Sequence, residues 1–171
     1  KIETISSMPG VCRYSVDKLN IILKKATKFE IPMVALFPYT PKNKKDSIGS
    51  EALNKNNLIC KSIRLIKKRY PTIGIMCDVA LDPYTTHGHD GIIVKGKVDN
   101  DKTIEILTKQ SILQAEMGCN VIAPSDMMDG RIGVIRKALD KKGFNDVIIL
   151  SYAAKYASNF YGPFRDAVGS K

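Results

Sequence analysis

Several features that define large protein classes are missing from this 171-residue sequence. No run approaches the roughly 18 to 20 consecutive apolar residues that cross a bilayer, so no membrane association is expected. Residues 1–10 lack the apolar segment of a signal peptide, which predicts a soluble, cytoplasmic protein. The chain has only 12 Gly and 8 Pro, which excludes collagen-like and low-complexity classes. A single globular domain over residues 1–171 is the expectation.

Cysteine is also scarce, and its spacing is uninformative for metal binding. The sequence has four cysteines and no Cys-x-x-Cys pair, so neither a disulfide framework nor a zinc ribbon is indicated. These residues are expected to be reduced thiols. They are Cys12, Cys60, Cys77 and Cys119.

Arginine is rare for such a basic protein. The formal net charge is +10, which raises the question of nucleic-acid binding. Only six of the 27 cations are arginines, although guanidinium is the preferred group for base and phosphate contacts. An RNA-binding domain would need clustered arginines and exposed aromatics. The lysines instead scatter along predicted helix faces, so a solvated surface and no nucleic-acid partner are expected.

What the sequence does contain is an alternation of helix and strand signals. Apolar residues recur at steps of three and four over residues 16–29, which predicts an amphipathic helix. The apolar run 31–37 then predicts a buried strand, and the pattern repeats along the chain. Further helices are predicted around 59–70, 104–115 and 132–139, and further strands at 72–81, 120–123 and 147–150. Ser125 or Asp126 is expected to cap the last of these helices.

Two local details complete this pattern. A small hairpin is predicted at 91–98, with Lys95 and Gly96 as its two-residue turn. Gly118 and Gly143 are expected to end the helices that precede them.

Strands separated by whole helices imply right-handed crossovers and a parallel α/β sheet. A doubly wound sheet and a (β/α) barrel both satisfy this pattern. Each strand is followed at once by polar or conformationally special residues, and sites gathered at strand carboxyl ends are typical of barrels. Four strands are too few for a full barrel of about 250 residues. The prediction is therefore about half of a (β/α)8 barrel, with an open edge.

The segment 78–91 is the densest polar cluster in the sequence. It contains Asp78, Asp82 and Asp90 together with both histidines, His87 and His89. Carboxylates and imidazoles can hold a divalent cation or act as acid and base. The same residues are also ordinary in a turn, because histidines beside glycine often bond only nearby backbone. The residue types alone leave both interpretations open.

A single lysine, Lys155, follows the last predicted strand amid small and aromatic residues. Partial desolvation there would favour the neutral amine, the form that attacks a carbonyl to give a Schiff base. A surface lysine lying along apolar neighbours is the alternative. Residues 160–165 are predicted to form an aromatic, turn-containing loop that ends in Arg165, a guanidinium suited to a carboxylate.

Four long motifs together resemble the bacterial δ-aminolevulinic acid dehydratases, also called porphobilinogen synthases. The resemblance extends over essentially the whole chain. The motifs are SSMPGV followed by RYS at 6–15, DVALDPYTTHGHDG at 78–91, APSDMMDGR at 123–131 and SYAAKYASNFYGPFR at 151–165.

The resemblance implies a barrel lyase that condenses two molecules of 5-aminolevulinate into porphobilinogen, with loss of two waters, in tetrapyrrole and heme synthesis. The lysine of the family's Ser-Tyr-x-x-Lys motif matches Lys155 and forms a Schiff base with one substrate. Arg165 matches the carboxylate-binding arginine of Tyr-Gly-Pro-Phe-Arg, and Tyr161 of that motif is a further substrate-binding candidate. Asp78 and Ser125 match polar residues of the family site.

The sequence departs from the family pattern at the positions that hold zinc-binding cysteines in other members. Zinc-dependent members have cysteines at the positions matching Ala80, Asp82 and Asp90, and no thiolate stands at these positions here. Active-site zinc is therefore not expected. The aspartates resemble the branch that responds to Mg²⁺, and Asp82 and Asp90 are candidate metal ligands.

The family's second Schiff-base lysine, second arginine, allosteric Mg²⁺ glutamate and octamer-forming N-terminal arm have no match in these residues. The chain is accordingly expected to be a portion of a homo-octameric enzyme. An inert fragment of that enzyme is the alternative.

Overall fold

The computed structural model describes residues 1–156 and 158–169. Ala157, which falls in the motif around Lys155, and the last two residues, Ser170 and Lys171, lie outside the described part. The strands are β1 (Ile2–Thr4), β2 (Cys12–Tyr14), β3 (Met33–Leu36), β4 (Gly74–Val79), β5 (Ile92–Val94), β6 (Lys97–Asp99), β7 (Val121–Pro124) and β8 (Ile148–Ile149). The α-helices are α1 (Leu19–Lys28), α2 (Leu58–Arg69), α3 (Asn100–Glu116), α4 (Arg131–Lys141) and α5 (Tyr161–Val168), and short 3-10 helices span Val16–Lys18, Lys42–Lys44 and Ser50–Leu53.

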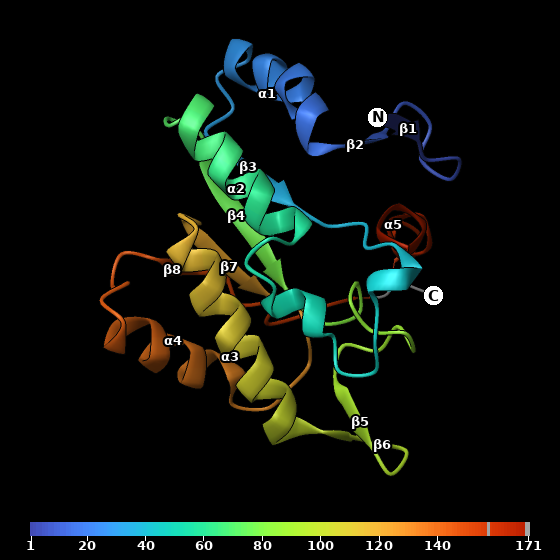
Figure 1. Cartoon of the computed structure of the whole chain (residues 1–171), viewed down its shortest axis with the longest axis vertical. Coiled ribbons are helices and arrows are strands. Elements are labelled where there is room, and N and C mark those ends of the chain that lie inside the picture. The colour runs from blue at the N-terminus through green and yellow to red at the C-terminus, as the bar shows by residue number, and fades with distance from the viewer. Residues whose placement is uncertain (157, 170–171) are drawn as a thin grey trace.

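A four-stranded parallel sheet forms the centre of the molecule (Figure 1). The strand order is β3-β4-β7-β8, and each neighbouring pair is parallel. The connection from β3 to β4 runs through α2, that from β4 to β7 through α3, and that from β7 to β8 through α4. The predicted parallel α/β sheet of four strands is therefore confirmed.

The two faces of this sheet differ in what covers them. Alternation along β4 buries Ile75, Cys77 and Val79 in the core that the helices share, because period-two geometry sends these side chains to one face. The opposite face carries Asp78 and is much less covered. Its outer strands leave Met33 38% and Ile148 60% exposed. The sheet thus has a packed helical side and an open side, and its outermost strands are β3 and β8.

Two antiparallel hairpins flank the sheet. The predicted one pairs β5 with β6, and its turn residues Lys95 and Gly96 have φ values of 51° and 76°, as a two-residue hairpin turn requires. The other pairs β1 with β2 near the N-terminus and was not predicted.

Two local predictions were wrong. Helix α4 begins after Gly130, not at Ser125 or Asp126. Asp126 lies in the preceding turn, where it accepts the Met128 N–H at 2.8 Å. Residues 161–168, expected to begin as an aromatic loop, form helix α5. Gly118 and Gly143 do stand at the ends of α3 and α4, each one residue past the C-cap and with a positive φ.

Within residues 1–156 and 158–169, no helix combines the length and the apolar character that a membrane span requires.

Candidate functional site

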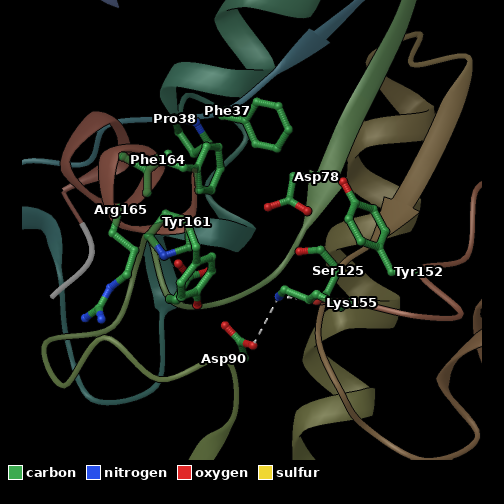
Figure 2. Close-up of a pocket in the computed structure, with 13 residues that line it drawn as sticks. Phe37, Pro38, Asp78, Asp90, Ser125, Tyr152, Lys155, Tyr161, Phe164 and Arg165 are labelled. Carbon is green, nitrogen blue, oxygen red and sulfur yellow. Dashed lines mark hydrogen bonds and ion pairs between the residues drawn. The ribbon is translucent and has the colours of Figure 1, made fainter. Parts of the chain in front are cut away.

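A cavity of about 230 Å³ opens at the carboxyl ends of the parallel strands (Figure 2). All the site residues that the sequence predicted line this cavity, although they come from widely separated segments. They are Asp78, Asp82, Asp90, Ser125, Lys155, Tyr161 and Arg165. These side chains therefore gather beyond the strand ends, where the sequence placed them, and their roles stay predictions.

Neighbouring strands bring Asp78 and Ser125 together. Asp78 is the fifth residue of β4, on the open face of the sheet, and it pairs in register with Ala123 of β7. Ser125 follows β7 directly, and its N–H donates to the Val79 carbonyl at 3.4 Å. Because parallel strands end at the same edge, the hydroxyl of Ser125 and the carboxyl of Asp78 face the same cavity.

Lys155 reaches this position from the segment that follows β8. Its Nζ donates a hydrogen bond to the Ser125 carbonyl at 2.6 Å and lies 3.9 Å from Oδ2 of Asp90. The side chain is 30% exposed, so it is partly removed from water as the sequence predicted. The lysine nitrogen therefore has a fixed location inside the cavity, with a neutral and a charged oxygen beside it (Figure 2).

Asp78 has the most perturbed acid–base chemistry in the cavity. Burial raises the pKa of its carboxyl to about 7, and the charges of Asp82 and Asp90 push in the same direction. A hydrogen bond from Ser125 and the positive charge of Lys155 oppose that rise. Oδ1 of Asp78 is buried and has no hydrogen-bond partner among the described residues. A carboxyl with these properties can give or take a proton near neutral pH.

Helix α5 forms the wall opposite Lys155. Tyr161, Phe164 and Arg165 are spaced three and four residues apart, so they share one side of the helix and reach the cavity together. The Phe164 ring meets Phe37 edge-on, with centroids 5.0 Å apart. Figure 2 places Tyr161 between the guanidinium of Arg165 and the nitrogen of Lys155. The site therefore has a lysine at one end and a guanidinium at the other.

The two histidines of segment 78–91 point to backbone groups. His87 Nε2 lies 3.2 Å from the Ser47 carbonyl, and its Nδ1 accepts the His89 N–H at 3.1 Å. His89 Nδ1 accepts the Gly91 N–H at 3.1 Å. Both histidines are exposed and neither lines the cavity. The turn interpretation is therefore right for the histidines, whereas Asp82 and Asp90 of the same segment do reach the site.

The donor atoms at the three positions where the resemblance implies zinc do not suit that ion. Ala80 offers only a methyl group, and Asp82 and Asp90 offer hard carboxylate oxygens, where zinc sites of this kind use thiolates. In the part of the chain that the structure describes, no three His, Cys, Asp or Glu side chains are grouped as a metal site would need.

Sequence reasoning missed much of the aromatic wall. Phe37, Tyr152 and Phe164 line the cavity but were not named as site residues. Burial, and next the nearby Asp78, raise the pKa of Tyr152, so its hydroxyl keeps its proton in this environment. One signal was available, since Phe37 and Tyr152 each stand one to three residues beyond a strand end.

Comparisons with known proteins agree with this geometry. The family model for delta-aminolevulinic acid dehydratase matches residues 1–171. The chain is 58% identical over 170 residues to the delta-aminolevulinic acid dehydratase of Bradyrhizobium diazoefficiens, covering 99% of this chain and 48% of that protein. It is 48% identical over 168 residues to the enzyme of the same name from Chlamydia pneumoniae, covering 98% of this chain and 51% of the relative. The chain thus spans about half the length of these relatives.

A solved structure shows the same fold. The crystal structure of porphobilinogen synthase from Toxoplasma gondii, in complex with its reaction product porphobilinogen, superposes with a TM-score of 0.96 at 42% identity. The match covers 99% of this chain and 49% of that one, so the four parallel strands and their helices correspond to about half of a (β/α)8 barrel. The chain belongs to the delta-aminolevulinic acid dehydratase family.

Proposed function

We propose that this chain supplies one Schiff-base lysine and one substrate site of a porphobilinogen synthase, which condenses two molecules of 5-aminolevulinate with loss of two waters. The observation that carries the proposal is the position of Lys155. Its nitrogen lies in a cavity with a proton-exchanging carboxyl, and the cavity belongs to a chain of this enzyme family. The condensation needs two substrate molecules held in fixed orientation, and this chain supplies only one of the two sites. We therefore propose that the complete polypeptide is the active species.

The first chemical step uses Lys155 as a nucleophile. Its neutral amine attacks the ketone carbon of 5-aminolevulinate, forming a C–N bond while the carbonyl electron pair moves to oxygen. The oxygen takes a proton and the nitrogen loses one, which gives a carbinolamine. The hydroxyl then leaves as water after a second protonation, the nitrogen loses its remaining proton, and a C=N bond forms.

Asp78 is the group suited to these proton transfers. Because its pKa is about 7, the protonated and ionised forms are both populated under physiological conditions. The acid form protonates the departing hydroxyl, and the resulting carboxylate then accepts the proton from nitrogen. The Ser125 hydroxyl hydrogen-bonds this carboxyl and holds it toward the lysine.

Arg165 and Tyr161 are proposed to bind the substrate carboxylate. A guanidinium presents paired N–H donors that match a carboxylate, and the phenol adds a further donor. Both side chains line the cavity from α5. The distance between the two ends of the cavity would thus select a short molecule with a ketone and a carboxylate.

The family resemblance supports further proposals on the complete protein. It is expected to be a cytoplasmic homo-octamer whose allosteric Mg²⁺ is bound outside these 171 residues. Active-site zinc is not part of the proposal, because the donors at 80, 82 and 90 suit it poorly. No nucleic-acid or membrane partner is proposed.

The test is porphobilinogen formation by the full-length protein and by its Lys155→Met variant. The substitution removes the amine and is expected to lower kcat by roughly 1,000-fold or more. Lys137→Met is the matched control, since Lys137 is an exposed lysine on α4 away from the cavity. Equal activity of the Lys155→Met variant and wild type, or no porphobilinogen from wild type, would overturn the proposal.

A further inference from the structure

The C-terminal end of α5 is bound by two cations from distant parts of the chain. Nη1 of Arg13, in β2, donates to the Ala167 carbonyl at 3.4 Å. Nζ of Lys45, beyond the 3-10 helix Lys42–Lys44, donates to the Gly169 carbonyl at 3.0 Å. The last carbonyls of a helix lack partners within it and carry partial negative charge, so positive side chains are favourable there. Figure 1 shows α5 beside the segment that leads from β3 to that 3-10 helix.

Tyr39 fills the space between these contacts. The guanidinium carbon of Arg13 lies 4.1 Å from the centre of the Tyr39 ring, a cation–π arrangement. On another side the ring packs against Gly169, where an added Cβ would come within 2.5 Å of Tyr39 Cε2. Gly169 also has a φ of +65°, so glycine is favoured here for both space and backbone conformation.

Both cations are themselves fixed by neighbours. Arg13 makes an ion pair with Glu3 at 3.2 Å across the β1–β2 hairpin, and only 24% of its side chain is exposed. Lys45 is half-buried, and this burial lowers the pKa of its amine while the charge of Asp82 opposes the shift. Asp82 in turn lines the cavity. The end of α5 is therefore tied to the hairpin on one side and to the cavity wall on the other.

The middle of α5 contacts the rest of the chain through the Phe164 ring, which meets Phe37 edge-on. Tyr161 and Arg165 belong to this same helix and line the cavity. The contacts at Ala167 and Gly169, together with the buried Val168, hold the end of the helix that carries Arg165, whereas the position of Lys155 comes from a different segment.

We propose that Arg13, Tyr39 and Lys45, named here the α5 clamp, are positioning residues that hold Arg165 and Tyr161 at the distance from Lys155 that the substrate carboxylate requires. This inference rests on the proposed function. Loss of the clamp would let the carboxylate-binding end of the cavity move while the lysine end stays in place. Substrate capture should then weaken more than the chemical steps at Lys155.

The experiment compares Lys45→Met and Lys42→Met in the full-length protein. Both remove one lysine charge from the same loop. Lys42 is exposed, whereas Lys45 is half-buried and hydrogen-bonds the Gly169 carbonyl. Lys45→Met is expected to raise the apparent KM for 5-aminolevulinate about tenfold, with kcat within about twofold of wild type. Lys42→Met should leave both within about twofold.

Amide hydrogen exchange of the 161–168 peptide gives a readout independent of activity. Exchange should be faster than wild type in Lys45→Met and unchanged in Lys42→Met, because only the first variant frees the helix end. Gly169→Ala, which displaces Tyr39, is the second variant should Lys45→Met fail to fold. Gly143→Ala is its control, since Gly143 has a φ of +81° but nothing within 4 Å of an added Cβ.

Three results would overturn the clamp. They are an unchanged KM with unchanged exchange in both clamp variants, equal effects in the clamp variants and their controls, and a fall in kcat at constant KM. A wild-type protein that makes no porphobilinogen overturns the proposed function instead. In that case faster exchange of α5 in Lys45→Met would still support the clamp itself.

Discussion

The amine of Lys155 donates to the backbone carbonyl of Ser125 at 2.6 Å, so the segment after β8 is tied to the end of β7. The same serine uses its side chain to hydrogen-bond Asp78 in β4. Ser125, which follows β7, therefore contacts both Lys155, the proposed nucleophile, and Asp78, the proposed proton carrier. The sheet register places Asp78 and Ser125, whereas Lys155 reaches them from the irregular segment after β8.

The first prediction is that ionisation of the buried Asp78 carboxyl lowers the stability of the folded protein. Its pKa is about 7 in the folded protein and near the ordinary 3.8 when unfolded. Between these values the folded state keeps a proton that the unfolded state releases, so stability falls as pH rises from about 4 to 7. Asp78→Asn cannot ionise. It should therefore gain stability over wild type at pH 8, by about 2 to 4 kcal/mol, and much less at pH 5.

Thermal unfolding of the full-length protein at both pH values measures this difference. Asp146→Asn, at an exposed position, is the control and should show no pH-dependent gain. The same Asp78→Asn variant should lose about 100-fold in kcat, because the amide cannot transfer a proton. A stability gain of equal size at pH 5 and pH 8 would show that the Asp78 carboxyl is not the titrating group.

The convergence of these residues was predictable because it follows from topology. Once the sequence showed strands alternating with whole helices, parallel pairing placed the residues after each strand at one edge. This rule placed Asp78 and the residues after β7 at one edge, and the family resemblance then selected Asp78 and Ser125 as site residues. Lys155 needed the same rule together with a motif that the family resemblance supplied.

Other features were not predictable because they depend on contacts distant in the chain. Gly162 and Pro163 suggested a turn, yet Pro163 is the third residue of α5. Proline is tolerated there because the first N–H groups of a helix have no acceptor within the helix. Asp126 has the side chain of a cap, but burial beside Arg131, at 3.1 Å, holds it in the turn before α4. The contacts of Arg13 and Lys45 with α5 join positions 154 and 124 residues apart, which no local pattern reports.

The second prediction concerns zinc. Activity of the full-length protein should stay within about twofold after treatment with a zinc-selective chelator, since Asp82 and Asp90 offer oxygen and position 80 offers no donor. Porphobilinogen formation before and after chelation is the measurement. Activity that disappears and returns with zinc alone would contradict the account.

The third prediction concerns residues 1–171 produced alone. Sheet strands β3 and β8 have open edges, and Met33, Ile148 and Leu150 are 38%, 60% and 44% exposed. Unpaired strand edges and exposed apolar side chains favour association. The isolated chain should therefore elute at twice its 18.9 kDa or more and form essentially no porphobilinogen.

Size-exclusion chromatography with light scattering, followed by an activity assay on each fraction, tests both parts of that prediction. The full-length protein serves as the positive control. A monodisperse monomer, or turnover near the full-length rate, would mean that the second half of the barrel contributes less than we infer.

The central claim is that Lys155 forms the covalent bond to substrate, and borohydride trapping tests it most directly. Full-length protein mixed with 5-aminolevulinate and borohydride should yield a secondary amine on Lys155, because hydride reduces the C=N bond before it hydrolyses. Mass spectrometry of the peptide containing Lys155 should show this adduct, and the Lys155→Met variant should show none at that position. An active enzyme whose Lys155 peptide stays unmodified under these conditions would contradict the account.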